Sequence, residues 1–529
     1  MSIRDGTPRS TALQWWREHV ERDDYVIGKD DFPDFTASAF LRSGGYVLEV
    51  AGGLAWILAR PGVDVLPDAL YPNYWSVVRV LLAAYAPAVV DRVSAVRLHL
   101  EEATPPPVLT VRQAGNASKR AIELASGFGL LLRPGEVDPL LTVERRPMGI
   151  SIPVEDPAAT LLGLPVEFLR DDPELVALWL KSLVVSRQKL EEAYARRPRP
   201  VVLKRLGGIS REVGNRRLAD QIDEVLKGGY RHRVGRGHTE RGPGFAVPAH
   251  VAGLATTHQP WLDRQAATFA RFRAEIEDAL GAAEAKLPRF GRGELLAQAR
   301  AAKAYDAYHS TTIEGYRIRP EEVSAVISGV AVGGNDPEEV RSRMAVAGYS
   351  KAFESALTTM RDSGGEVEIT ETLVQGLYID LFSPSVDAGI VSPELLRGWR
   401  TEPAYLRGHL HVPPGPEKLP RLMRQYEQLV DGVTGHPLIR AVLAHLELVT
   451  IHPYPDGNGR LARLLMNVAL LGGGLPWVTI RNDERTPYFA ALHAAQVEGN
   501  PLPFARFVLR YAESAAESLD AGPSSGKPR

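Results

Sequence analysis

The chain has 529 residues, of which 44% are hydrophobic and 24% are charged. These fractions exclude a disordered or fibrous protein, and at about 150 residues per domain the length predicts roughly three domains. The formal net charge of −2 does not by itself indicate a nucleic acid or any other partner. The absence of cysteine excludes disulfides, thiolate metal sites and thiol nucleophiles.

The amino-terminal sequence, MSIRDGTPRS, has no apolar core of the kind that a targeting signal carries. The most apolar stretch, residues 77–90, is shorter than a membrane span and contains Arg79 and Pro87. We therefore expect a cytoplasmic protein with no membrane partner. The sequence does not predict its oligomeric state.

The first 70 residues have the outline of a winged helix-turn-helix. Helical patterns over residues 11–22 and 36–43 are followed by two apolar runs around a turn at residues 51–53, which predict a β-hairpin over residues 46–58. Because Arg42 is the single basic residue of the second helix, that helix is poorly suited to reading DNA bases.

Residues 71–228 carry no chemical motif. Together with the winged-helix outline, the segments SAVRLHLEEATPPPVLTV (94–111) and GNRRLADQIDEVLKGGY (214–230) resemble the amino-terminal and middle parts of AbiE-type antitoxin regulators. This resemblance implies a DNA-binding transcriptional regulator, with contact to DNA through residues 10–60.

A stretch rich in Gly, Arg, His and Pro at residues 228–260 separates this half from a carboxyl-terminal half dominated by helical patterns. The expected fold is therefore multidomain, an α+β amino-terminal region followed by an all-α carboxyl-terminal domain. The expected segments are 1–70 (winged helix-turn-helix), 71–155 (small α+β domain), 156–228 (helical region), 229–262 (linker), 263–515 (all-α domain) and 516–529 (disordered tail).

The chemistry of the chain is concentrated in HPYPDGNGRLAR, residues 452–463, which forms a loop between two helical patterns. Gly457, Asn458 and Gly459 allow successive backbone N–H groups to point inward at the start of the second helix, which predicts an anion nest. Arg460 and Arg463 lie on one face of that helix and can bind the same polyphosphate.

Two further residues complete this loop. Asp456 is a single carboxylate, which suits Mg²⁺ because that ion takes its other ligands from phosphate oxygens and water. His452 has a reference pKa near 6.5 and can accept a proton from a hydroxyl at neutral pH. The expected ligand is a nucleotide or another phosphate ester.

The loop resembles the signature of the Fic (Fido) family, His-x-Phe-x-Asp/Glu-Gly-Asn-Gly-Arg-x-x-Arg, with Tyr454 in place of Phe. The resemblance extends over about residues 292–511. It implies transfer of AMP from ATP, with Mg²⁺, to a Ser, Thr or Tyr hydroxyl of a target protein or of the chain itself. The implied roles are general base for His452, metal ligand for Asp456, phosphate contacts for Gly457, Asn458 and Gly459, with Asn458 on the α-phosphate, and charge neutralisation for Arg460 and Arg463.

Upstream residues resemble the flap of this family, a β-hairpin that pairs with an extended segment of the target protein. The expected hairpin is short and runs roughly from Arg400 to Val412. An ordinary surface hairpin is the alternative interpretation. The flap residues are Gly398, Trp399, Arg400 and Thr401.

Ser310-Thr-Thr-Ile-Glu314-Gly315 fits Ser/Thr-x-x-x-Glu-Gly/Asn, the inhibitory helix of self-restrained (class II) Fic proteins. The resemblance implies that Glu314 pairs with Arg463, so that ATP binds with its α-phosphate misplaced for attack. The alternative is a surface carboxylate on an ordinary helix.

The sequence leaves several functions open. Removal of AMP and transfer of another phosphate-containing group use the same family scaffold. A DNA-binding regulator that carries a silent Fic domain is the alternative from another functional class. Asn467 and Tyr488 are candidates for adenine contacts by position alone.

Overall fold

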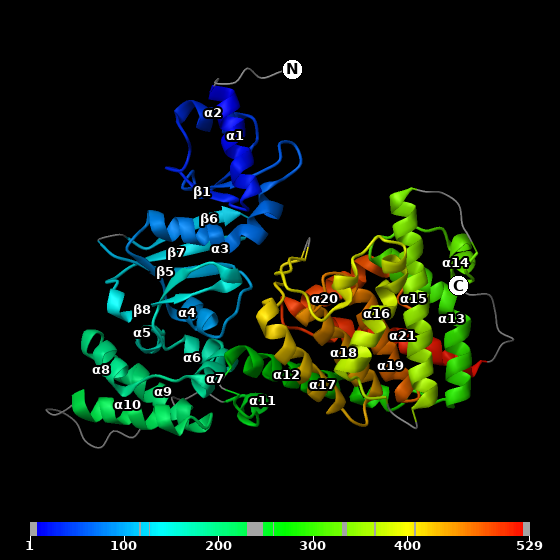
Figure 1. Ribbon diagram of the computed structural model, residues 1–529. Coiled ribbons are helices and arrows are strands. Elements are labelled where there is room, and N and C mark those ends of the chain that lie inside the picture. The colour runs from blue at the N-terminus through cyan, green and yellow to red at the C-terminus, as the bar shows by residue number, and fades with distance from the viewer. Residues whose placement is uncertain are drawn as a thin grey trace. The chain divides into compact units, whose positions relative to one another are not determined.

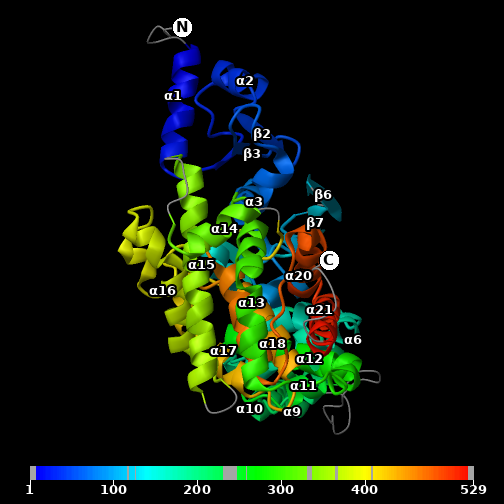
Figure 2. The ribbon, with the colours of Figure 1, turned by 90° about the vertical axis from the view of Figure 1, so that its right-hand side faces the viewer.

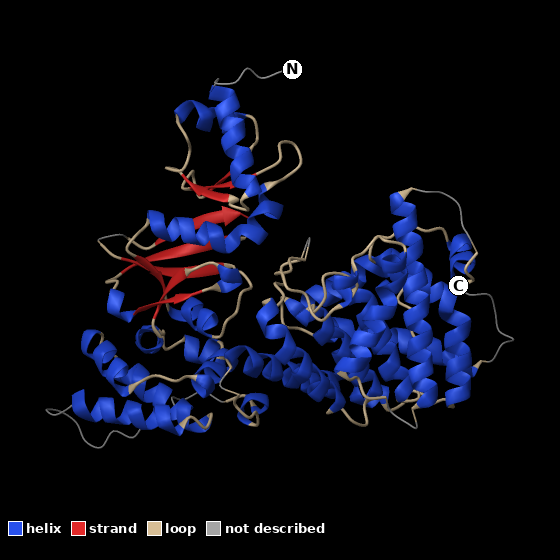
Figure 3. Cartoon of the chain, in the orientation of Figure 1, coloured by secondary structure: helices blue, strands red, loops and turns tan. Residues whose placement is uncertain are grey.

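The computed structural model describes residues 8–115, 118–125, 127–229, 247–257, 259–330, 336–363, 367–406 and 409–521. The chain divides into two compact units, Met1–Ala267 and Thr268–Arg529. Within the described residues every strand belongs to the first unit, and the second unit is helical, as the red strands and blue helices of Figure 3 show. The predicted α+β amino-terminal region and all-α carboxyl-terminal region are therefore confirmed.

The first unit begins with a small helix-and-sheet layer. Its elements are α1 (Pro8–Glu21), β1 (Val26–Gly28), α2 (Phe35–Ser43), β2 (Val47–Val50) and β3 (Ala55–Leu58), with the strands in the order β1-β3-β2. The Asp34 side chain caps α2 by accepting a hydrogen bond from the Ala37 N–H at 2.7 Å. The predicted hairpin forms, because β2 and β3 pair antiparallel.

The connection between α1 and α2 differs from the predicted helix-turn-helix. Buried Val26 and Ile27 form β1, which pairs with β3, so a strand and a loop separate the two helices instead of one tight turn. A three-residue strand is too short for alternation in the sequence to indicate it. The winged-helix assignment stays a prediction.

A six-stranded mixed sheet follows, in the order β6-β7-β5-β4-β9-β8. Helix α3 contacts both sheets of the unit, and α4 packs on β5 and β9 (Figure 1). The elements are α3 (Leu66–Ala84), β4 (Ala88–Val90), α4 (Arg92–His99), β5 (Val108–Gln113), β6 (Arg120–Ala125), β7 (Phe128–Pro134), β8 (Thr142–Arg145) and β9 (Ile152–Glu155), with short 3-10 turns at Pro139–Leu141 and Pro147–Gly149.

Seven helices complete the described part of this unit before α12. Their apolar faces share one core, in which Trp179 and Leu206 are buried. The helices are α5 (Pro157–Gly163), α6 (Phe168–Asp171), α7 (Pro173–Ser182), α8 (Arg187–Arg196), α9 (Pro200–Glu212), α10 (Arg216–Gly229) and α11 (Ala249–Ala252). Residues 230–246 of the expected linker lie outside the described residues, and its last part contains α11 and the start of α12.

The described part of the second unit consists of helices, often with Pro in the first turn. They are α12 (Pro260–Glu284), which crosses the unit boundary, α13 (Arg292–Ile313), α14 (Pro320–Ile327), α15 (Pro337–Asp362), α16 (Glu371–Asp387), α17 (Leu419–Asp431), α18 (Pro437–Ile451), α19 (Asn458–Gly472), α20 (Arg485–Gln496) and α21 (Leu502–Asp520), with 3-10 turns at Pro393–Leu396, Pro416–Lys418 and Asn482–Glu484.

Helices α18 and α19 form the centre of this unit. Almost every residue of both helices is buried, including the charged Arg460 and Arg463 of α19. Figures 1 and 2 show α13 and α15 running side by side, and α19 contacts both of them. The loop of residues 452–457, between α18 and α19, is therefore held by two helices of the core.

Two predictions fail in this unit. Residues 400–406 and 409–412, the described part of the predicted flap hairpin, contain no strand. A two-stranded hairpin without a third partner is marginal in water, and here side-chain bonds to backbone carbonyls hold the segment instead. Residues 516–520 of the predicted disordered tail belong to α21, where buried Ala512 and Ala516 continue its apolar face; residues 522–529 lie outside the described residues.

Candidate functional site

The loop begins and ends with backbone in the left-handed region. His452 is the C-cap of α18, with φ 51° and ψ 59°, and its N–H donates to the Leu448 carbonyl at 2.8 Å. Gly457 is the N-cap of α19, with φ 80°. A side chain at residue 457 would also collide with the Phe382 ring, 2.6 Å from an ideal Cβ, so the sequence requires glycine there.

Asn458 holds the loop closed. Its Oδ1 accepts a hydrogen bond from the Tyr454 N–H at 3.0 Å, and its Nδ2 donates to the Tyr454 carbonyl at 2.7 Å. The side chain is 1% exposed. One N–H of its Nδ2 and one lone pair of its Oδ1 are thus engaged by the backbone, and the expected contact with the α-phosphate stays a prediction.

Tyr454 packs beneath the loop. Its ring stacks on Tyr378 with the centroids 3.6 Å apart and lies 5.2 Å from the ring of Trp399. The two tyrosine hydroxyls are buried, and neither has a hydrogen-bond partner within the described part of the chain. The loop thus rests on an aromatic base that does not need the Tyr454 hydroxyl.

His452 lies in an environment that favours the neutral imidazole. Burial lowers its pKa from the usual 6.5 to about 4, and the charges of Arg400 and His411 act in the same direction. A hydrogen bond with the Val449 backbone and the Asp456 carboxylate oppose them. At neutral pH the imidazole therefore carries no proton charge and can accept a proton from a hydroxyl.

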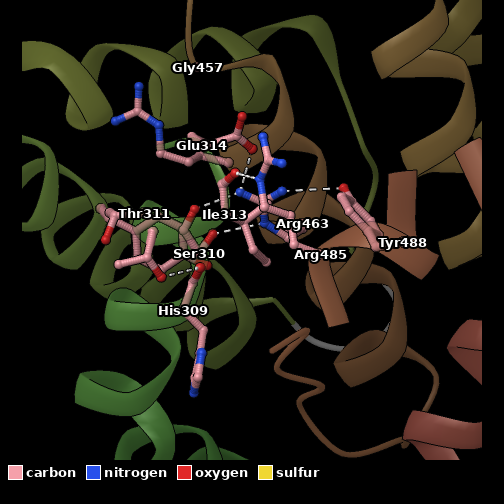
Figure 4. A network of polar contacts seen from close by, with 12 residues as sticks. His309, Ser310, Thr311, Ile313, Glu314, Gly457, Arg463, Arg485 and Tyr488 are labelled. Atoms are coloured by element: carbon pink, nitrogen blue, oxygen red, sulfur yellow. Dashed lines mark hydrogen bonds and ion pairs between the residues drawn. The ribbon is translucent and has the colours of Figure 1, made fainter. Parts of the chain in front are cut away.

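Arg463 is the centre of a buried polar network, drawn in Figure 4. Its Nε donates to Ser310 Oγ at 2.9 Å, and its Nη2 donates to the Ser310 carbonyl and to Glu314 Oε1, both at 2.7 Å. Its Nη1 donates to the Tyr488 hydroxyl at 3.2 Å. The guanidinium is 3% exposed, so every direction of its fork is engaged by protein groups.

Glu314 reaches this network from the C-terminal end of α13. Ser310 and Glu314 are four residues apart on one face of the helix, and Arg485 Nε binds the Ile313 carbonyl at 2.8 Å beside them. An ideal Cβ at Gly459 would lie 2.2 Å from Glu314 Oε1, so the carboxylate rests directly against the start of α19. Gly315 follows, outside the helix.

Tyr316 is a contact residue that the sequence analysis missed. Its hydroxyl donates to Asp456 Oδ2 at 3.1 Å and accepts from Arg460 Nη2 at 3.3 Å. The Arg460 guanidinium, 1% exposed, lies between the rings of Tyr316 and Phe382, 4.9 and 5.0 Å from their centroids. Only its position two residues after Glu314 could have drawn attention to Tyr316.

Asp456 is the residue in the loop that could hold a metal ion. Its side chain is 55% exposed, and Oδ1 accepts from the Gly457 N–H at 2.6 Å. No group of three or more His, Cys, Asp or Glu in the described ranges could hold a metal ion. A single exposed carboxylate fits Mg²⁺ that takes its remaining ligands from phosphate and water, and does not fit a site made only of protein ligands.

The two candidates for adenine contacts have other partners. Asn467 Oδ1 accepts from the Val478 N–H at 2.7 Å, and its Nδ2 donates to the Val478 carbonyl at 2.9 Å. Besides Arg463, the Tyr488 hydroxyl contacts His445 Nε2 at 2.9 Å. Both residues are 1% exposed. Asn467 connects α19 to the backbone of Val478, and Tyr488 accepts a hydrogen bond from Arg463. Neither side chain is therefore free to contact a base.

The four predicted flap residues lie differently with respect to the loop. Trp399 contacts Tyr454, and Arg400 is 5% exposed with its guanidinium on the His452 carbonyl. Gly398 precedes them, and Thr401 is exposed. The structure thus brings Trp399 and Arg400 to the loop and leaves Thr401 at the surface.

Comparison with known proteins finds sequences similar to the region that carries this site. The sequence model of the Fic/DOC family matches residues 368–470. Two curated relatives are both called "Protein adenylyltransferase Fic": that of Drosophila mojavensis is 35% identical over 220 residues and that of Drosophila erecta 33% identical over 217 residues. Each alignment covers 40% of this chain and 40% of the relative, so the chain matches about two fifths of their length.

A solved structure of residues 134–508 of Fic-1 from C. elegans is 22% identical, covers 67% of this chain and 98% of that chain, and has a TM-score of 0.38. No helix in the described ranges is both long and apolar enough to cross a membrane. The family match includes the whole loop and most of the two helices that carry it. Residues 368–470 of the carboxyl-terminal unit, which carry this loop, are therefore similar to the Fic/DOC family.

Proposed function

We propose that the chain transfers AMP from ATP to a Ser, Thr or Tyr hydroxyl of a target protein or of itself. The observation that carries this proposal is the loop of residues 452–457. It places a neutral imidazole at one end and the amino terminus of α19 with two buried arginines at the other. The name of the curated relatives supports the same reaction.

In this reaction His452 accepts the proton of the target hydroxyl as its oxygen attacks the α-phosphorus. The bond to the bridging oxygen breaks, and pyrophosphate leaves. The N–H groups at the start of α19, which have no partner within the helix, bind phosphate oxygens. Arg460 and Arg463 neutralise the charge that develops on the leaving group. Asp456 would hold Mg²⁺, which neutralises charge on the phosphates when bound.

We further propose that Glu314 restrains this activity. Its carboxylate occupies Arg463 Nη2 and rests against Gly459, where a phosphate must approach. Tyr316 occupies Asp456 and Arg460 in the same state. The groups proposed to bind phosphate and metal are therefore bound to the end of α13 and the residues after it, and ATP competes with them.

We propose that residues 397–415, called the flap segment below, dock the target protein. Tyr405 and Leu410 are exposed there. The DNA-binding alternative has less support, because residues 10–60 contain five Lys or Arg against eight Asp or Glu. A surface with an acidic excess repels the phosphate backbone that dominates affinity for DNA.

The test is transfer from α-labelled ATP with Mg²⁺ to the chain itself and to proteins of a cell lysate. We compare the wild type, Glu314→Gly, and Glu314→Gly/His452→Ala. Glu314→Gly should transfer label strongly and the wild type weakly. Glu314→Gly/His452→Ala should transfer no label while still binding ATP. Glu498→Gly, which removes an exposed carboxylate outside the site, is the matched control and should label like the wild type.

Absence of label in all four proteins would contradict AMP transfer. Equal label in the wild type and Glu314→Gly would leave transfer standing and remove the proposed restraint. Retained transfer in the double variant would show that His452 is not the base.

A further inference from the structure

We propose that Arg400 is a positioning residue for His452: its guanidinium fixes the left-handed backbone of the proposed base and ties it to both arms of the flap segment. This inference deepens the proposed function and rests on it. It assigns to Arg400 a role in the rate of transfer that is separate from target docking.

The contacts of Arg400 join three stretches of backbone. Its Nε donates to the His452 carbonyl at 2.8 Å and its Nη1 to the Glu402 carbonyl at 2.8 Å. Its Nη2 donates to the Pro414 carbonyl. Its own N–H donates to the Pro453 carbonyl at 2.9 Å. One buried side chain thus connects the loop that carries the base with the beginning and the end of the flap segment.

The backbone of His452 needs this support. A residue with a Cβ is strained in the left-handed region, and such strain persists only where surrounding contacts determine it. On the helix side the His452 N–H is fixed by the Leu448 carbonyl, and on the loop side Arg400 fixes the carbonyls of His452 and Pro453. Without the Arg400 side chain the His452 carbonyl loses its donor. The loop side then keeps only the backbone N–H of residue 400 on the Pro453 carbonyl, and the imidazole loses its fixed direction.

Arg400 also contributes a positive charge. Burial lowers its pKa to about 10, so the guanidinium stays charged at neutral pH. The charged groups that act on His452 are Arg400, His411 and Asp456, of which the first two lower the pKa of the imidazole and the third raises it. Loss of the Arg400 charge should therefore raise the pKa of His452.

Geometry and charge can be separated by substitution. Lysine at this position keeps the charge but cannot reach three carbonyls with one ammonium, because only the planar guanidinium presents donors as a fork. Methionine keeps much of the length and removes both the donors and the charge. Arg440 is the matched control, because it is another arginine at 5% exposure, bound to the carbonyls of Val367 and Val430 and away from the loop.

The experiment measures kcat and KM for ATP against pH in the Glu314→Gly background. Arg400→Lys should lower kcat about tenfold or more, in line with the cost of small misplacements of a reacting group, and change KM less than twofold. In this variant the pH at which kcat falls on the acid side should not change. Arg400→Met should lower kcat similarly and move the acid limb to higher pH. Arg440→Lys should change neither kcat nor the pH at which kcat falls on the acid side, even where it changes the stability of the protein.

A second measurement does not depend on transfer. NMR titration of ¹⁵N-histidine, with the His452 signal assigned by its loss in His452→Ala, should show a higher His452 pKa in Arg400→Met than in Arg400→Lys or in the parent. Unchanged kcat in Arg400→Lys, or an equal loss in Arg440→Lys, would overturn the inference, as would an unchanged His452 pKa in Arg400→Met. If the Glu314→Gly parent transfers no label, the proposed function fails, and the titration still decides whether Arg400 acts on His452.

Discussion

At the scale of single residues, Tyr454 separates a role in packing from a role in hydrogen bonding. Its hydroxyl is buried and unpartnered in the described part of the chain. A buried hydroxyl without a partner costs about 1–3 kcal/mol. Tyr454→Phe should therefore raise the free energy of unfolding by about 1 kcal/mol, as measured by denaturant titration, and leave the rate of the proposed AMP transfer unchanged.

The matched control for this prediction is Tyr426→Phe. Tyr426 is equally buried, but its hydroxyl donates to the Ala444 carbonyl at 3.1 Å. Removing that donor should lower the free energy of unfolding by about 1 kcal/mol. If Tyr454→Phe is the more destabilising of the two, the Tyr454 hydroxyl has a partner after all and the interpretation is wrong.

At the scale of elements, α15 and α16 approach each other closely at Gly348. An ideal Cβ there would lie 1.9 Å from the Leu381 carbonyl oxygen of α16, and backbone cannot yield as a side-chain end can. Gly348→Ala should therefore push the two helices apart and lower the free energy of unfolding by about 1–3 kcal/mol. Gly376→Ala on α16, where a Cβ meets nothing within 4 Å, should stabilise slightly or have no effect.

The contrast between these two glycines in denaturant unfolding tests the helix pairing itself. Equal stability of the two variants would mean that the helices are less closely packed at Gly348 than the structure has them. Because α16 carries Phe382 and Tyr378 to the loop, Gly348→Ala should also lower transfer.

Much of this architecture could be predicted, because helices are specified by local signals. Asp336 and Pro337 at the start of α15 are one example, and the apolar run of α18 is another. The absence of the expected hairpin from the described part of the flap segment could not be predicted. A strand forms only where a partner strand accepts its hydrogen bonds, and there side-chain bonds from Arg400 replace that partner.

The candidate site divides in the same way. The residue types of the loop indicated the chemistry, since base, carboxylate, glycines and arginines are contiguous in the chain. The role of Asn458 could not be predicted, because sequence does not say whether an amide faces a ligand or its own backbone. The contact of Tyr316 with Asp456 joins residues 140 positions apart, and only tertiary structure brings them together.

At the scale of the whole molecule, the first unit raises the question of which partner it binds. The charges of residues 10–60, with eight acidic and five basic side chains, disfavour contact with DNA phosphates. Phe35, at the start of α2, is 83% exposed, which is more typical of a surface that meets an apolar partner than of one that follows a phosphate backbone.

We therefore expect the full-length chain not to retard duplex DNA in gel electrophoresis at low salt. If it does, the logarithm of the binding constant should be measured against the logarithm of the salt concentration, because the slope reports the number of phosphates that the protein neutralises. A slope of several units that persists in Arg42→Ala but disappears in Arg216→Ala/Arg217→Ala would place DNA on α10. A slope that disappears in Arg42→Ala would place it on α2 and restore the winged-helix regulator as a function of this unit.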